Sequence, residues 1–161
     1  MNGALEGADA GRSRRRRDGP DNPEAVWTTK LTDARTAGTP SITDGTVYVP
    51  VDAVSDRAHY DYRLHALEAS TGEERWQASL RSDPNPSPAV DGHSIVVSAR
   101  RGSESSRLVA FDAHDGNEQW LYDVDARVTA PPTVDGTTVY LPDWEGYVHA
   151  VSKYGSEHWS R

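Results

Sequence analysis

Short runs of alternating apolar and polar residues, separated by turn-forming residues, make up most of this chain. Between residues 107 and 112, Leu108 and Ala110 point one way and Val109 and Phe111 the other, which is the period of a β-strand. No stretch of useful length has apolar residues at i, i+3, i+4 and i+7, the pattern of an amphipathic helix. The pattern therefore predicts an all-β chain without helices.

Two segments recur in step along the chain. One ends in a tryptophan, at Trp76, Trp120 and Trp159. The other places an Asp-Gly pair between two short β-branched or aromatic runs, a strong hairpin signal, at residues 44–45, 91–92 and 135–136. Successive Asp-Gly pairs lie 47 and 44 residues apart, and periods of about 40–50 residues with short strands are typical of propeller blades.

Each repeat unit is predicted to form four antiparallel strands. In the middle unit we expect strands at 87–90, 94–99, 107–112 and 118–124. Residues 25–31, which contain Trp27, resemble the last strand of a preceding unit. The predicted fold is an incomplete β-propeller, made of three four-stranded blades plus an orphan N-terminal strand. The blades would span about 32–80, 81–125 and 126–161, with 25–31 as the outer strand.

A small-residue motif precedes each repeated tryptophan. In the first two units Ala, Gly and Trp stand at relative positions one, seven and eleven, whereas the third unit is one residue shorter between Ala and Gly. This motif resembles the tryptophan-docking motif of the PQQ-type (quinoprotein-like) β-propeller repeats. That resemblance covers roughly residues 25–161, and the family includes quinoprotein alcohol dehydrogenases and non-enzymatic outer-membrane assembly lipoproteins. The motif residues are Ala66, Gly72, Trp76, Ala110, Gly116, Trp120, Ala150, Gly155 and Trp159.

We interpret the repeated tryptophans as packing residues. Small Ala and Gly residues would let an indole lie flat against the backbone of a neighbouring strand or blade. The alternative is a ring of tryptophans that stacks a ligand. Trp120 is expected to be the most buried of the five, because its unit has a neighbour on both sides. Trp144 lies outside the pattern, in the tight turn 143–146, and is either an exposed contact residue or a side chain folded back on its own hairpin.

No catalytic, cofactor-binding or metal-ligating residue stands out. The segment from Val51 to Arg63 carries several Asp, His and Tyr residues, but without a metal-ligand spacing, and is interpreted as a solvated polar loop. His65 and His149 occupy the position where the middle unit has Val109. A position that accepts Val indicates packing and not a metal ligand or a base.

The charge balance is strongly acidic. The chain has 17 Lys and Arg against 25 Asp and Glu, a formal net charge of −8. This argues against nucleic acid and anionic membrane surfaces as partners, because both attract positive footprints. Lys30 and Lys153 are the only lysines, and an acidic, lysine-poor surface is typical of proteins from halophiles.

Residues 1–24 are predicted to be a disordered tail, because they mix Gly, Ala, Asp, Arg, Asn and Pro with few large apolar residues. The run Arg14–Arg17 is not followed by the apolar stretch that an export signal requires, so we expect no intact signal. No segment is apolar enough to insert into a membrane. Without cysteine there is no disulfide or thiolate chemistry, and the compartment stays open.

Two functions are compatible with these features. Three blades cannot close a ring, since propellers have about 4–8 blades, so the chain either belongs to a longer protein or assembles. The first function is a non-enzymatic scaffold or protein-interaction module that binds no cofactor and self-associates, or binds another protein, through its open blade faces. The alternative is a fragment of a PQQ-dependent dehydrogenase. That resemblance would imply a complete ring, a catalytic Asp, Ca²⁺-ligating Glu and Asn and usually an adjacent Cys pair, and we match none of these here.

Overall fold

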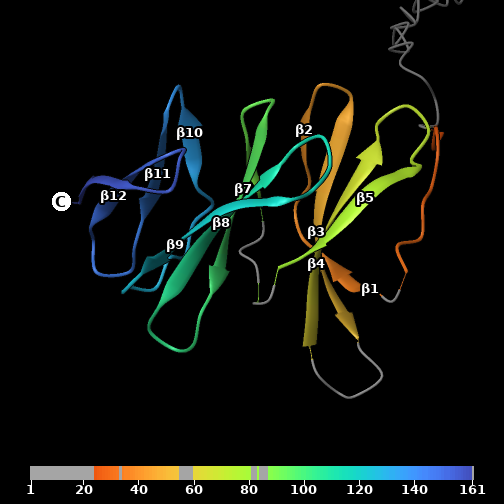
Figure 1. Ribbon diagram of the computed structural model, residues 1–161. Helices are drawn as coiled ribbons and strands as arrows, with labels where there is room; N and C mark the ends of the chain where they lie inside the picture. The colour runs from red at the N-terminus through yellow and green to blue at the C-terminus, as the bar shows by residue number, and fades with distance from the viewer. Residues whose placement is uncertain (1–23, 33, 55–59, 81–82, 84–86, 161) are drawn as a thin grey trace, which may run out of the picture.

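The described part of the chain forms three antiparallel sheets that lie side by side (Figure 1). The computed structural model describes residues 24–32, 34–54, 60–80, 83 and 87–160, and the side chains of all of these except 36, 54, 60 and 157–160. These residues contain no helix, so none of them forms a helix that could cross a membrane. The absence of helix and the three sheets agree with the expected incomplete propeller.

Each sheet carries four strands that follow one another in chain order, as the repeat predicts. The expected strand 118–124 is reproduced without change, and the other three of the middle unit differ by one or two residues at an end. The blades consist of β2 (Ser41–Thr43), β3 (Thr46–Val54), β4 (Tyr60–Glu68) and β5 (Glu74–Ser79); β6 (Ala89–Val90), β7 (Ser94–Arg100), β8 (Ser106–Asp112) and β9 (Glu118–Val124); and β10 (Thr133–Asp135), β11 (Thr138–Pro142), β12 (Val148–Ser152) and β13 (Glu157–Ser160).

The Asp-Gly pairs do turn the chain between the first two strands, but in more than one register. Asp44 and Gly45 both have positive φ angles, 45° and 71°, as a two-residue type I′ hairpin requires. In the third blade Asp135 still belongs to β10 and pairs with Thr138, so Gly136 is the first residue of the loop. The same dipeptide therefore serves two different hairpins.

The N-terminal part of the described chain departs from the prediction. Residues 25–31, expected to form an orphan strand, have no strand pairing with the described residues. They are attached by side chains instead, since Trp27 and Thr29 both bond to the backbone of the first blade. An unpredicted strand, β1 (Ala34–Ala37), adds a fifth member to the first sheet by pairing with β3.

The segment 51–63, expected to be a polar loop, is mostly strand. β3 and β4 are nine residues each and pair from Thr46↔Glu68 to Val54↔Tyr60, so only 55–59 lie between them, and those residues lie outside the described part. Alternation explains the difference, because Val51 and Ala53 are each 1% exposed while Asp52 between them points to the other face. A charged residue every second position does not prevent a strand.

The core lies between the blades. The second and third sheets enclose one apolar cluster, and Leu108, Leu141 and Val151 in it are fully buried. The first and second sheets enclose another, which contains Tyr48, Leu64 and Phe111. Contacts join β2 to β6 and β6 to β10, so the first strands of successive blades lie next to each other. Each blade thus buries its faces only against its neighbours in the chain, as in other repeat proteins.

Candidate functional site

Trp76 and Trp120 each dock on the glycine turn of the following blade. The Trp76 indole lies against Gly116 of the second blade, and its Nε1 donates a hydrogen bond to the Ala113 carbonyl at 3.1 Å. Trp120 packs in the same way on Gly155, with Nε1 donating to the Lys153 carbonyl. The sequence left a neighbouring strand and a neighbouring blade as alternatives, and the contacts select the blade.

Trp27 repeats this contact at the start of the described chain. Its Nε1 donates to the Ala69 carbonyl at 2.9 Å, and its ring lies against Gly72. Thr29 adds a bond from Oγ1 to the Gly72 carbonyl at 2.7 Å. The segment around Trp27 therefore takes the place of a preceding blade even though it is not a strand.

Glycine is required at the receiving turn for two reasons. Gly116 has a φ of 74°, in the left-handed region that favours glycine. A Cβ atom added to it would also lie 2.6 Å from Cε3 of Trp76, which is closer than real atoms approach. The alanines of the motif lie elsewhere, since Ala66 is the cross-strand partner of Trp76 and is fully buried.

The shortened third copy keeps the contact with a tighter turn. In the first two blades the glycine N–H bonds a carbonyl four residues earlier, as in Gly116 to Asp112 at 2.9 Å. In the third blade Gly155 N bonds the Ser152 carbonyl, three residues earlier, at 2.8 Å. Gly155 still has a positive φ of 84° and still receives Trp120. The missing residue changes the loop but not the docking.

Trp27, Trp76 and Trp120 are all half-buried, whereas Trp144 is exposed. The expectation that Trp120 is the most buried of the five stays a prediction, because these three share one burial class. The side chain of Trp159 lies outside the described part, although its backbone pairs with Ala150.

Trp144 is an exposed residue, as one of the two sequence interpretations had it. Its side chain is 72% exposed in the β11–β12 turn, and it does not fold back on its own hairpin. Its ring lies 5.6 Å from Cζ of Arg127, and its backbone N–H bonds the Arg127 carbonyl. Tyr147, in the same turn, is 50% exposed.

The two histidines at the packing position are buried or nearly so, but each also bonds a carboxylate. His65 is 1% exposed, and its Nδ1 lies 2.6 Å from Oε2 of Glu74. His149 Nε2 lies 2.9 Å from Oδ2 of Asp143. Among the residues that the structure describes, no three His, Asp or Glu side chains come together as a metal site would need. The interpretation as packing residues is therefore incomplete, because it missed the polar partners.

Asp143 organises the β11–β12 turn. Its side chain is 1% exposed and accepts hydrogen bonds from the backbone N–H groups of Glu145 and Tyr147 as well as from His149. Burial raises the pKa of this carboxyl, but the bonds from His149, Tyr147 and Glu145 outweigh it, so the pKa lies below the ordinary value of 3.8. The turn therefore depends on an ionised carboxylate.

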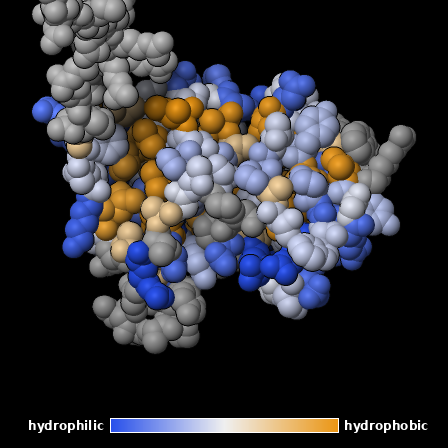
Figure 2. Space-filling model, turned by 180° about the vertical axis from the view of Figure 1, so that it is seen from behind, coloured by the Kyte–Doolittle hydropathy of each residue, from blue (hydrophilic) through white to orange (hydrophobic). Residues whose placement is uncertain are grey.

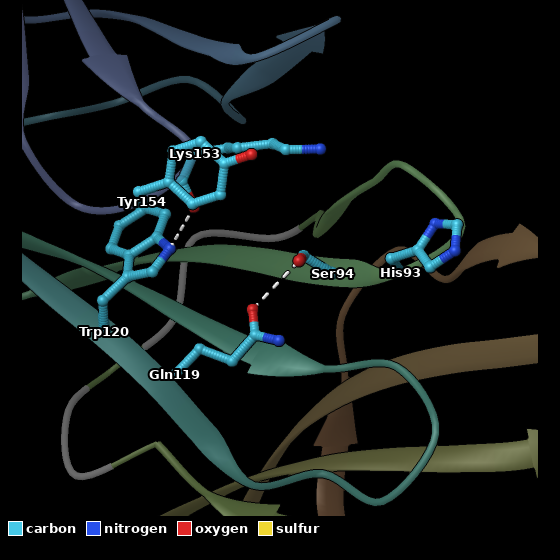
Figure 3. A pocket seen from close by; sticks show the side chains of 6 residues that line it. All are labelled: His93, Ser94, Gln119, Trp120, Lys153 and Tyr154. Carbon is cyan, nitrogen blue, oxygen red and sulfur yellow. Dashed lines mark hydrogen bonds between the residues drawn. The ribbon is translucent and has the colours of Figure 1, made fainter.

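A cleft of about 620 Å³ opens between the second and third blades, beside the Trp120 contact. Figure 3 shows Trp120 and Tyr154 at one end, with Lys153 and Gln119 along opposite sides. No repeated motif in the sequence predicted this site. A sequence signal for the cleft lies beside the tryptophan-docking motif, at a position where the repeat units differ. Gln119 precedes Trp120 there, whereas Arg75 precedes Trp76. The lining residues are His93, Ser94, Gln119, Trp120, Lys153 and Tyr154.

The docking contact predicts different costs for two glycine substitutions. Gly45→Ala should lower the free energy of unfolding by about 1–2 kcal/mol, since φ is 71° there and no atom lies within 4 Å of the new Cβ. Gly116→Ala should lose about a further 1–3 kcal/mol, because the methyl group also collides with Trp76. Urea midpoints of the two variants measure the difference. Equal losses would mean that the indole moves aside without cost.

The tryptophans are predicted to differ in how much each contributes to the free energy of unfolding. Trp76→Ala and Trp120→Ala should each cost about 3 kcal/mol, at the low end for large buried aromatics because both are half-buried. Trp144→Ala should cost less than about 1 kcal/mol, since it removes only an exposed contact with Arg127. Trp159→Ala is expected to be intermediate. Urea unfolding with a comparison of m values provides the test, and a Trp144 variant as damaging as the Trp120 variant contradicts it.

Acid should weaken the third blade through Asp143. A carboxyl whose pKa is lowered on folding adds stability above its unfolded pKa, near 3.8, and loses this contribution as the pH falls through the folded value. Asp143→Asn is therefore expected to be less stable than the wild type at pH 7, with the gap narrowing towards pH 3. The exposed Asp135→Asn serves as the control and should follow the wild-type profile. Urea midpoints of the two proteins are measured between pH 7 and pH 3. A difference in midpoint that stays constant over this range would exclude this contribution of Asp143.

Comparisons with known proteins agree with the geometry. The family described as outer membrane protein assembly factor BamB matches residues 19–161. No curated protein sequence matches the chain. Similar solved structures include BamB from Moraxella catarrhalis, which is 21% identical with a TM-score of 0.60 over 77% of this chain and 34% of that one. The chain thus spans about a third of the length of this relative.

Two dehydrogenases share the same fold. A europium-containing methanol dehydrogenase is 18% identical with a TM-score of 0.58, and the match spans 80% of this chain and 25% of that one. The quinohemoprotein alcohol dehydrogenase from Comamonas testosteroni is 22% identical with a TM-score of 0.57, over 80% and 21% of the two chains. At these identities the likeness establishes the fold and no activity. With the family match over most of its length, the chain belongs to the BamB family of PQQ-type β-propeller repeat proteins.

Proposed function

We propose that this chain is a non-enzymatic propeller-repeat scaffold that binds a second protein chain through its open blade faces, with a second copy of itself as the preferred partner. The observation that supports this is the outer face of the third blade, the side turned away from the second blade. Val148 on that face is 40% exposed, whereas Leu64, its counterpart on the first blade, is fully buried against the second blade.

The outer face of the third blade repeats the surface that the first blade uses to hold the second. Tyr140 pairs with Ala150 in the register in which Tyr48 pairs with Ala66. In the first blade this pair lies in the core, where Tyr48 packs on Trp76 with ring centroids 5.8 Å apart and bonds the Ala113 carbonyl of the next blade. The third blade thus presents a surface of the kind that receives a blade.

The opposite face of the first blade has the complementary character. Val47, Val49 and Leu67 stand where Ile95, Val97 and Phe111 of the second blade pack on the first. Ile42 on the same side is 64% exposed. Figure 2 shows hydrophobic residues gathered on the half of the molecule that holds the first blade. Val47 and Val49 are half-buried and Leu67 is buried, so Ile42 is the exposed apolar residue among those named on this face.

Head-to-tail association of two copies would match an outer face to a first-blade face, which is the pairing that already occurs twice within the chain. The incoming blade would have to displace Trp27, which occupies the Gly72 turn of the first blade. Two sets of three blades give six, within the usual propeller range of about 4–8. The net charge of −8 on each copy opposes this approach, so salt should favour it. The name of the family, an assembly factor, is in keeping with binding to another protein.

Self-association is tested by light scattering after gel filtration, at low and high salt. The wild type should form dimers, more completely at high salt. Val148→Glu places a charge on the outer face and should give monomers. Leu121→Glu is the matched control, because Leu121 is equally exposed, at 42%, but lies on β9 of the middle blade. It should leave the dimer intact.

A folded wild-type monomer at every salt concentration, without binding of an apolar dye, would remove the basis for this partner. Loss of the dimer in both variants would show that a surface other than the third-blade face joins the copies. Both variants need unchanged urea midpoints, so that assembly and folding are not confused.

The alternative function is part of a PQQ-dependent dehydrogenase, because two similar structures are dehydrogenases of this fold. We expect the purified chain to show no saturable binding of PQQ with Ca²⁺ in calorimetry and no alcohol-dependent dye reduction. The expectation is based on the absence from the sequence of positions that match the ligand set of those enzymes. Stoichiometric binding of PQQ would replace the scaffold proposal with the alternative.

A further inference from the structure

We propose that the cleft between the second and third blades binds a neutral, polyhydroxylated ring, that is, a sugar unit. The proposal is separate from the scaffold function, because the cleft lies at an interior junction and uses neither open face. Its volume, about 620 Å³, falls within the range of about 300–1,000 Å³ that small-molecule sites occupy.

One end of the cleft is aromatic. Trp120 uses its indole N–H on the Lys153 carbonyl, so the part of this half-buried side chain that faces the cleft is carbon surface. Tyr154 beside it is 74% exposed, so its ring is accessible to a ligand. The C–H groups of a sugar ring pack on flat apolar surfaces of this type, while its hydroxyl groups remain available for hydrogen bonds.

The remaining walls offer both donors and acceptors. Ser94 Oγ donates to Oε1 of Gln119 at 2.9 Å, and Gln119 Nε2 makes only a long bond of 3.3 Å to Asp112. The imidazole of His93 is exposed at the far end, and the Lys153 ammonium lies along one side (Figure 3). Hydroxyl groups donate and accept, so a polyol matches a mixed set of this kind better than a ligand with one polarity.

Charge favours a neutral ligand. The Lys153 ammonium lies 3.8 Å from Oδ2 of Asp91, too far for a hydrogen bond but close enough to offset its charge. An anion would therefore meet a neutralised lysine on a protein with a net charge of −8. Because the charges of Lys153 and Asp91 offset each other, the pair gives a cation no net attraction either. A ring without charge needs no such attraction.

Two lining positions of the cleft differ from their counterparts in the preceding repeat. Gln119 stands where the first blade has Arg75, which bonds Thr46 Oγ1 at 2.7 Å and pairs with Glu68 within its own blade. The turn of the third blade carries Lys153 and Tyr154, where the second blade has Ala113 and His114.

The test uses the full chain and ¹⁵N NMR titrations with methyl glucoside, N-acetylglucosamine and maltose. We expect saturable shifts centred on Gln119 and Tyr154, with a Kd on the order of 1 mM for one sugar unit in an open site. Gln119→Ala and Tyr154→Ala should each weaken binding about tenfold, a loss of about 1.4 kcal/mol. Tyr147→Ala removes a half-exposed tyrosine from another turn of the same blade and should leave the Kd unchanged.

Three outcomes would overturn the proposal. The first is the absence of any saturable shift with all three sugars. The second is tighter binding of acetate or phosphate than of the sugars, which would make the cleft an anion site at Lys153. The third is equal weakening by Tyr147→Ala, which would place binding elsewhere. Unchanged urea midpoints for the three variants exclude loss of folding as the cause of weaker binding.

Discussion

The contact between the tryptophan of one repeat and the glycine turn of the next is the interaction on which the rest of the structure depends. A four-stranded sheet has two apolar faces and cannot bury either of them alone. The aliphatic residues between the blades supply area but no register, since apolar contact is not directional. Trp76 and Trp120 supply the register, because a flat ring on a bare backbone with one hydrogen bond allows a single placement.

This constraint explains why sequence analysis recovers so much of the fold. Gly116 is needed both for its positive φ and for the space below Trp76, so it recurs with the tryptophan at a fixed spacing. The same spacing identifies three blades and their strands. The prediction of a strand at residues 25–31 was wrong for a related reason. Trp27 marks the outer edge of a blade, but a strand also needs a partner with free backbone groups, and the described residues offer none beside 25–31.

Other parts of the molecule depend on pairings that a single sequence does not display. The strand β1, Ala-Arg-Thr-Ala, lacks the β-branched and aromatic run that predicts a strand, and forms by pairing with the edge of β3. Likewise, a histidine in a valine position predicts burial correctly. Its carboxylate partner, Glu74 for His65, follows only from the cross-strand neighbourhood. The cleft beside Trp120 was missed because its lining comes from two blades, residues 93–94 and 119–120 of one and 153–154 of the other, and belongs to no single motif.

A binding site between two consecutive blades makes different demands on the chain from a site at the centre of a closed propeller. A cofactor at the centre of a propeller requires every blade at once, because its ligands come from the whole ring. A site between two consecutive blades requires only the two sheets and the tryptophan contact that fixes them, and the second and third blades meet that condition within this chain. Variation at such junctions leaves the framework intact, since Gln119 and Tyr154 lie beside the docking residues and not among them. A site between two consecutive blades of this chain therefore does not depend on a closed ring.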